Sequence, residues 1–135
     1  MANINLTCIV DDDEIFVYAM KKLISLRNLC NEVMVFNLVE DAITYLKKHQ
    51  SEPSLLPEII LLDINLPVMD GWDFLTEYKE LNPLLVKKPA IYMLSSSSNP
   101  ADQKRAEDTP YIKGYFVKPL SKEAFSTVFG AEINP

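Results

Sequence analysis

Acidic, hydroxyl and basic side chains follow four of the short apolar runs in this chain. They are Asp11 and Asp12 after LTCIV, Asp63 after EIILL, Ser95 after AIYML and Lys118 after YFV. Apolar runs of strand length that stop at turn or polar residues are typical of buried strands. In a parallel sheet the residues that follow the strands share one edge, so we expect these five side chains to meet there.

Three carboxylates at one edge need a cation. Two carboxylates ~4 Å apart repel by about 4 kcal/mol at an effective dielectric constant near 20, so crowded acids hold a proton or bind a cation. Mg²⁺ suits such a site because it takes one or two carboxylates and keeps waters or phosphate oxygens as its other ligands. A lysine ammonium and a serine hydroxyl suit the remaining oxygens of a phosphoryl group.

Asp63 is the predicted nucleophile for this phosphoryl group. It stands alone after its strand, whereas Asp11 and Asp12 are adjacent and better placed as metal ligands. Attack by a carboxylate that gives an aspartyl phosphate is established chemistry, and it depends mainly on alignment and charge neutralisation.

Strand and helix patterns alternate along the whole chain. Strands are expected at residues 6–10, 32–37, 58–62, 90–94 and 115–117, and helices at 15–24, 40–49, 72–81, 101–108 and 121–130. Asp13, Asn99 and Ser121 are the expected N-caps, and Gly130 is expected to end the last helix. This alternation predicts an α/β fold with a parallel sheet covered by helices on both faces.

Four segments resemble the signature segments of response-regulator receiver domains. They are IVDDD at 9–13, LLDINLPVMDG at 61–71, MLS at 93–95 and VKPL at 117–120. The resemblance implies a flavodoxin-like, doubly wound sheet of five parallel strands in the order 2-1-3-4-5, with five helices in three α/β/α layers. It also implies that residues 1–135 form one stand-alone receiver domain of the chemotaxis-regulator type, with no output domain.

The resemblance assigns the metal site residue by residue. Asp63 matches the phospho-acceptor, Asp12 the direct Mg²⁺ ligand, and Asp11 the neighbour that acts through a water molecule. Asn65 matches the position whose backbone carbonyl completes the metal shell. Mg²⁺ is the expected cofactor, with Mn²⁺ as an alternative.

The resemblance also assigns a switch. Ser95 matches the hydroxyl residue that moves toward the phosphoryl group, and Lys118 matches the family's lysine, with a cis bond expected before Pro119. Tyr115 matches the aromatic residue that turns inward when Ser95 moves. The surface of the fourth helix, fifth strand and fifth helix would then change.

Composition limits the partners and the location. A net charge of −6 over 135 residues argues against direct nucleic-acid binding. No signal peptide or apolar run of membrane-span length is present in the sequence, and Cys8 and Cys30 read as free thiols, so we expect a cytoplasmic protein. The implied partners are a sensor histidine kinase or a histidine phosphotransfer protein, together with a downstream protein target.

Two other functions remain open from the sequence. One is a small phosphohydrolase that uses Asp63 as nucleophile, but such enzymes resemble the haloacid-dehalogenase class, which places a second Asp where this chain has Asn65. The other is a receiver-like binding scaffold that never takes phosphate, although such scaffolds commonly lack one of the key residues retained here. We therefore expect a phospho-acceptor that at most catalyses its own phosphorylation and slow dephosphorylation, rather than an enzyme.

Overall fold

A computed structural model describes residues 4–130 and contains a five-stranded parallel sheet in the order β2-β1-β3-β4-β5. The strands are β1 (Ile4–Val10), β2 (Cys30–Phe36), β3 (Ile59–Asp63), β4 (Ala90–Ser95) and β5 (Ile112–Val117). The helices are α1 (Glu14–Leu26), α2 (Val39–Lys48), α3 (Gly71–Leu81), α4 (Pro100–Glu107) and α5 (Lys122–Phe129), with short 3-10 turns η1 (Pro53–Leu55) and η2 (Asn82–Leu84). The predicted flavodoxin-like fold and strand order are confirmed.

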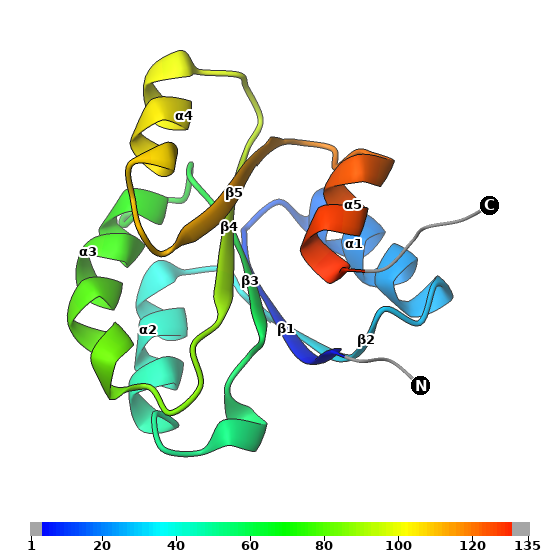
Figure 1. Ribbon diagram of the computed structural model, residues 1–135. Coiled ribbons are helices and arrows are strands. Elements are labelled where there is room, and N and C mark those ends of the chain that lie inside the picture. Colours follow the sequence, from blue (N-terminus) through cyan, green and yellow to red (C-terminus); the bar gives the residue numbers. More distant parts are fainter. Residues whose placement is uncertain (1–3, 131–135) are drawn as a thin grey trace.

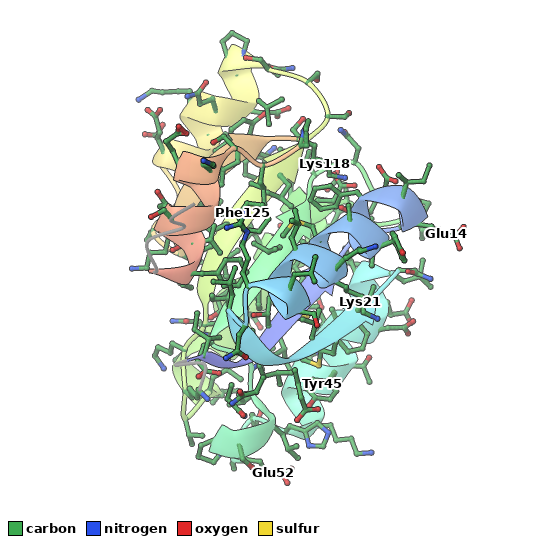
Figure 2. All side chains as sticks on the ribbon, turned by 90° about the vertical axis from the view of Figure 1, so that its right-hand side faces the viewer. Glu14, Lys21, Tyr45, Glu52, Lys118 and Phe125 are labelled. Carbon is green, nitrogen blue, oxygen red and sulfur yellow. The ribbon has the colours of Figure 1, made fainter. Side chains whose placement is uncertain are left out.

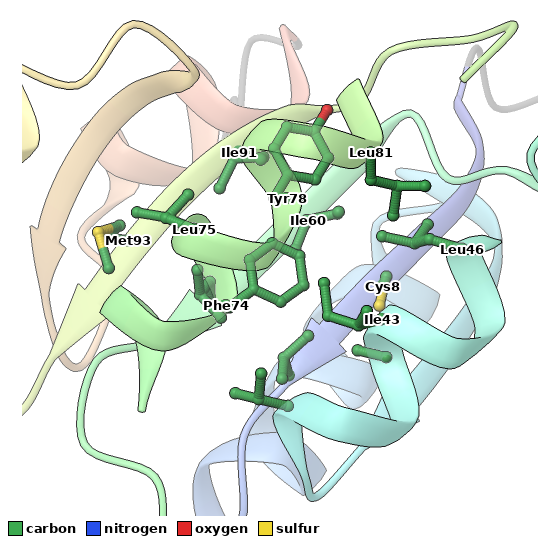
Figure 3. Packing of buried hydrophobic residues seen from close by; sticks show 14 of the residues in the cluster. Cys8, Ile43, Leu46, Ile60, Phe74, Leu75, Tyr78, Leu81, Ile91 and Met93 are labelled. Carbon is green, nitrogen blue, oxygen red and sulfur yellow. The ribbon is translucent and has the colours of Figure 1, made fainter. Parts of the chain in front are cut away.

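Helices cover both faces of the sheet (Figure 1). α1 and α5 pack on one face with Ile9, Leu61 and Leu94, and α2 and α3 pack on the other. Figure 3 shows the second layer, in which Phe74 and Leu75 of α3 lie beside Ile60 of β3. Because successive side chains of a strand point to opposite faces, the central strands serve both layers.

The helix boundaries follow from capping residues. Asp13, Asn99 and Ser121 accept hydrogen bonds from backbone N–H groups of the first turns of α1, α4 and α5, which confirms the predicted N-caps. Gly130 follows α5 with a φ of 62°, a left-handed conformation that glycine adopts without steric cost. α4 is the most weakly anchored helix, because Ala106 is its one buried residue.

Two expectations about the strands were wrong. β5 begins at Ile112 rather than Tyr115, and Gly114 lies inside it, next to a register shift against β4. A Cβ at Gly114 would lie 3.1 Å from the Tyr92 ring, so glycine permits this close approach. β2 begins at Cys30 rather than at residue 32, so Cys30 is a buried strand residue. No helix within residues 4–130 is long and apolar enough to cross a membrane.

Candidate functional site

The strand register brings the two halves of the acidic site together. β1 and β3 are neighbours although about fifty residues separate them in the chain, and Val10 pairs with Leu62. Asp11 and Asp63 therefore stand at the same level at the carboxyl edge of the sheet. β4 and β5 continue this edge, where Ser95 pairs with Val117 just before Lys118.

Asp11, Asp12 and Asp63 form one cluster, in which a carboxylate oxygen from each lies within 4.8 Å of the other two. Asp11 and Asp63 are buried, whereas Asp12 is exposed. Two short backbone bonds orient the buried pair. The N–H of Asp13 donates to Asp11 Oδ1 at 2.9 Å, and the N–H of Asn65 donates to Asp63 Oδ1 at 3.1 Å.

Lys118 reaches the two buried carboxylates. Its Nζ lies 2.7 Å from Asp11 Oδ2 and 3.4 Å from Asp63 Oδ2. The backbone N–H of Lys118 donates to the Ser95 carbonyl at 2.8 Å, and the bond to Pro119 is cis. Burial alone would lower the pKa of Lys118, but the contacts with Asp11 and Asp63 outweigh it and raise that pKa, so the ammonium stays charged.

Asp63 has an unusual acidity for a carboxylic acid. Burial and the neighbouring charge of Asp11 raise its pKa to about 6, although Lys118 and the Asn65 N–H oppose the shift. The carboxyl is therefore mostly ionised at neutral pH, although its burial and the charge of Asp11 disfavour the ionised form. Any cation that joins the cluster would favour the ionised form.

The cluster fits a hard divalent cation. Its donors are all carboxylate oxygens, the type that Mg²⁺ and Mn²⁺ prefer. Asp11 Oδ2 is buried and makes no hydrogen bond of acceptable geometry, although Lys118 lies beside it as an ion-pair partner. The exposed Asp12 leaves the cluster open to solvent on one side, so an ion could enter while keeping several waters.

Ser95 and Tyr115 are linked through the backbone of Ser97. The buried Ser95 Oγ accepts a hydrogen bond from the Ser97 N–H at 3.2 Å. The half-buried Tyr115 donates its hydroxyl proton to the Ser97 carbonyl at 3.4 Å. The structure therefore bonds the two predicted switch residues to the backbone N–H and the backbone carbonyl of one residue, Ser97.

Two residues make contacts with Lys118 that the sequence did not predict. Asp13 caps α1 as expected, but its second oxygen, Oδ2, lies 4.0 Å from Lys118 Nζ. The Phe16 ring lies under the same ammonium, with its centroid 4.5 Å from Nζ. The sequence does not predict the contact of Phe16, because residue spacing within one helix carries no information about a lysine that lies about a hundred residues away.

A hollow of about 670 Å³ opens beside the acidic cluster. It runs from Asp12 along α1 past Tyr18 to Lys22. Asp11 and Asp12 thus lie at one end of this hollow, and Figure 2 shows Lys118 near the start of α1, where Glu14 is labelled.

Comparisons with known proteins agree with this geometry. The family model of the response regulator receiver domain matches residues 7–129. A crystal structure of a two-component response regulator from Cytophaga hutchinsonii is 28% identical, covers 98% of both chains and superposes with a TM-score of 0.85. The Mn²⁺-bound form of response regulator Rcp1 and the phosphorylated cyanobacterial phytochrome response regulator RcpA are each 27% identical. Both have a TM-score of 0.73 and cover 93% of this chain and 89% of their own.

A relative by sequence is a probable methanogenesis regulatory protein, FilR2, from Methanothrix harundinacea. It is 33% identical over 82 residues, which make up 61% of this chain. The match spans 51% of FilR2, so this chain corresponds to about half of that protein.

Proposed function

This chain belongs to the response regulator receiver domain family, and we propose that it accepts a phosphoryl group on Asp63 in a two-component or phosphorelay system. The observation that carries this proposal is the ammonium of Lys118 held between Asp11 and Asp63 beside a cluster of three carboxylates. The receiver family is a family of signalling phospho-acceptors, and RcpA in this family has been crystallised in phosphorylated form. The donor would be a sensor histidine kinase or a histidine phosphotransfer protein.

In the proposed transfer, a carboxylate oxygen of Asp63 attacks the phosphorus of the donor phosphohistidine. The new O–P bond forms as the P–N bond breaks, and the departing imidazole nitrogen keeps the electron pair. Asp63 is mostly ionised at neutral pH, because its pKa is about 6, so it can act as the nucleophile. Lys118 lies where it can bind a phosphoryl oxygen, and the Ser95 hydroxyl is positioned to be drawn toward a second one.

Mg²⁺, or Mn²⁺ in its place, is the proposed cofactor, and when bound it neutralises charge on the phosphoryl oxygens. Asp12 and Asp63 would be direct ligands, Asp11 would act through water, and the Asn65 carbonyl would complete the set. The donor atoms of the acidic cluster support this assignment. The related Rcp1 has been crystallised with Mn²⁺.

The proposed output is a change on the α4–β5–α5 surface. If Ser95 moves toward the phosphoryl group, its hydrogen bond to the Ser97 N–H breaks, and the backbone of Ser97, whose carbonyl accepts the Tyr115 hydroxyl, is free to shift. Tyr115 could then repack against the weakly anchored α4. The same proposal includes a downstream protein that binds this surface, and a cytoplasmic location.

The test is labelling with acetyl phosphate and Mg²⁺, followed by intact-mass analysis and peptide mapping. We expect one phosphoryl group on Asp63 and none in Asp63→Asn. Asp70→Asn, which changes an acid that caps α3, is the matched control and should label normally. Labelling of Asp63→Asn, or steady turnover of a phosphomonoester without a phosphoprotein, would contradict the proposal.

Asp12→Ala tests the cofactor separately. We expect it to weaken Mg²⁺ binding, measured by calorimetry, and to abolish the rise in thermal midpoint on adding Mg²⁺ with beryllium fluoride. Asp102→Ala, which removes an acid from the first turn of α4, is the control. A wild-type protein that does not respond to Mg²⁺ and beryllium fluoride would indicate a binding scaffold instead.

A further inference from the structure

The ammonium of Lys118 lies between two buried carboxylates and an aromatic ring. Asp11 and Asp63 approach it with carboxylate oxygens, whereas the Phe16 ring lies 4.5 Å from it. The Lys118 side chain is only 10% exposed, so this contact is largely removed from solvent. A cation over an aromatic face is attracted by the ring's electron density, and more strongly when water is excluded.

Phe16 is itself fixed in place. It is buried in the layer between α1 and the sheet, and its backbone N–H donates to Asp13 Oδ1 at 3.1 Å. The ring therefore sits on the first turn of α1, in a position set by both the core and the helix cap. A fixed ring can act as one wall of the space that Lys118 occupies.

A lysine ammonium needs such a contact to stay in one position, because its four-carbon stem is flexible and the ammonium has no preferred direction. A competing partner is near, since the half-exposed Asp13 Oδ2 lies 4.0 Å from Nζ. An ammonium that moved toward Asp13 would leave the gap between Asp11 and Asp63. The Phe16 ring favours the buried position, because the cation keeps both the ring contact and the two buried acids there.

We propose that Phe16 is a positioning residue for phosphoryl transfer, acting through Lys118 by a contact between the ammonium and the ring face. This inference rests on the proposed function of Asp63. It assigns to the first turn of α1 a direct part in holding the lysine that meets the phosphoryl group, in addition to its part in the core.

The test replaces Phe16 with 4-fluoro-, 3,5-difluoro- and 3,4,5-trifluorophenylalanine by site-specific incorporation. Fluorine withdraws electron density from the ring face and nearly preserves the shape of the side chain. The rate of labelling by acetyl phosphate in Mg²⁺ should fall step by step, by about tenfold across the series, as expected for a buried cation–ring contact. A flat series, with wild-type protein still labelled on Asp63, would overturn the inference and leave the proposed function standing.

Phe125 provides the matched control. It is buried in the same layer as Phe16, and Figure 2 shows it on α5, apart from Lys118. The same fluorinated series at Phe125 should change the labelling rate by less than about twofold, since a packing role responds to shape rather than to ring charge. Equal falls at both positions would overturn the inference.

A second readout does not depend on phosphate chemistry. Protons held over an aromatic face resonate upfield, so the ε-methylene signal of Lys118 should be displaced in protein labelled on lysine Cε. Phe16→Leu should return this signal to the range of the other lysines, and Phe16→Trp should keep it displaced. An ordinary Lys118 signal in the folded wild-type protein would overturn the inference. A displaced signal in a protein that is never labelled on Asp63 would reject the proposed function, and would leave the contact between Lys118 and the Phe16 ring without a role in phosphoryl transfer.

Discussion

The ammonium of Lys118 lies closer to Asp11, at 2.7 Å, than to Asp63, at 3.4 Å. The lysine is thus held mainly by Asp11 and less closely by Asp63, the proposed phospho-acceptor. Asp11 is fully buried and its Oδ2 has no other partner of suitable geometry, so Lys118 compensates a charge that has no access to bulk water.

Lys118→Met should therefore destabilise the metal-free protein by about 2–4 kcal/mol, because it leaves a buried charge without compensation. Added Mg²⁺ should recover part of this loss of stability by neutralising the carboxylates of Asp11 and Asp63 in place of the ammonium. The measurement is urea unfolding with EDTA and with Mg²⁺. Lys104→Met is the control, since its ion pair with Asp108 is exposed, and should cost less than about 1 kcal/mol. Equal effects of the two substitutions would refute this prediction.

The pKa of Asp63 predicts a pH dependence of stability without metal. Between its ordinary value of 3.8 and about 6, the folded state keeps a proton on Asp63 that the unfolded state has lost. The contribution of Asp63 to the free energy of unfolding therefore falls as pH rises through this window, and is constant above it. Asp63→Asn removes the cost of ionising this buried carboxyl. The free energy of unfolding of the variant, relative to that of wild type, should therefore rise by about 2–3 kcal/mol from pH 4 to pH 7.

Denaturant titrations of both proteins in EDTA at several pH values measure this difference. Mg²⁺ at pH 7 should shrink it, since a cation relieves the same repulsion. A difference that does not change between pH 4 and pH 7 would show that Asp63 has an ordinary acidity.

Gly71 controls the backbone that carries Asp63. A Cβ there would lie 2.8 Å from the Asp63 carbonyl oxygen and 3.0 Å from Ile64 Cα, and both are backbone atoms that cannot turn aside. Gly71→Ala should cost about 1–3 kcal/mol and slow labelling of Asp63. In Gly130→Ala the new Cβ meets nothing within 4 Å, so only the left-handed φ is strained. That control should lose stability of about 1 kcal/mol but label at the normal rate.

Arg105 holds α4 against the start of α3. Its guanidinium carbon lies 4.2 Å from the ring centroid of Trp72, and Trp72 is the single tryptophan of the chain. Arg105→Met should shift the Trp72 emission and speed hydrogen exchange in α4, with a loss of about 0.5–1 kcal/mol. Gln103→Met, an exposed change on the same helix, should alter neither signal. Unchanged emission in Arg105→Met would mean that the stacked pair does not form in solution.

The sequence predicted the elements whose boundaries depend on local chemistry. Asp13, Asn99 and Ser121 act as N-caps through bonds within four residues, so their role can be inferred from neighbouring residues alone. The gathering of Asp11, Asp12 and Asp63 was also predictable, because it follows from parallel strands that end at one edge.

Features that depend on contacts between distant segments were not predictable. The start of β5 was missed because Gly114 is a weak strand former, and its place in the strand depends on the fit against the Tyr92 ring. The ring of Phe16 under Lys118 was missed for the same reason: the first turn of α1 meets the end of β5 only after folding.

The pairing of Val10 with Leu62 has a consequence beyond packing. If β3 slid by one residue along β1, Asp63 would turn to the opposite face and its apolar neighbours would exchange layers. The same slip would remove Asp63 from the acidic cluster and disrupt the hydrophobic core, so a misaligned molecule would lose the proposed site and its packing together. The alignment of β1 with β3 therefore couples correct folding to assembly of the proposed phospho-accepting site.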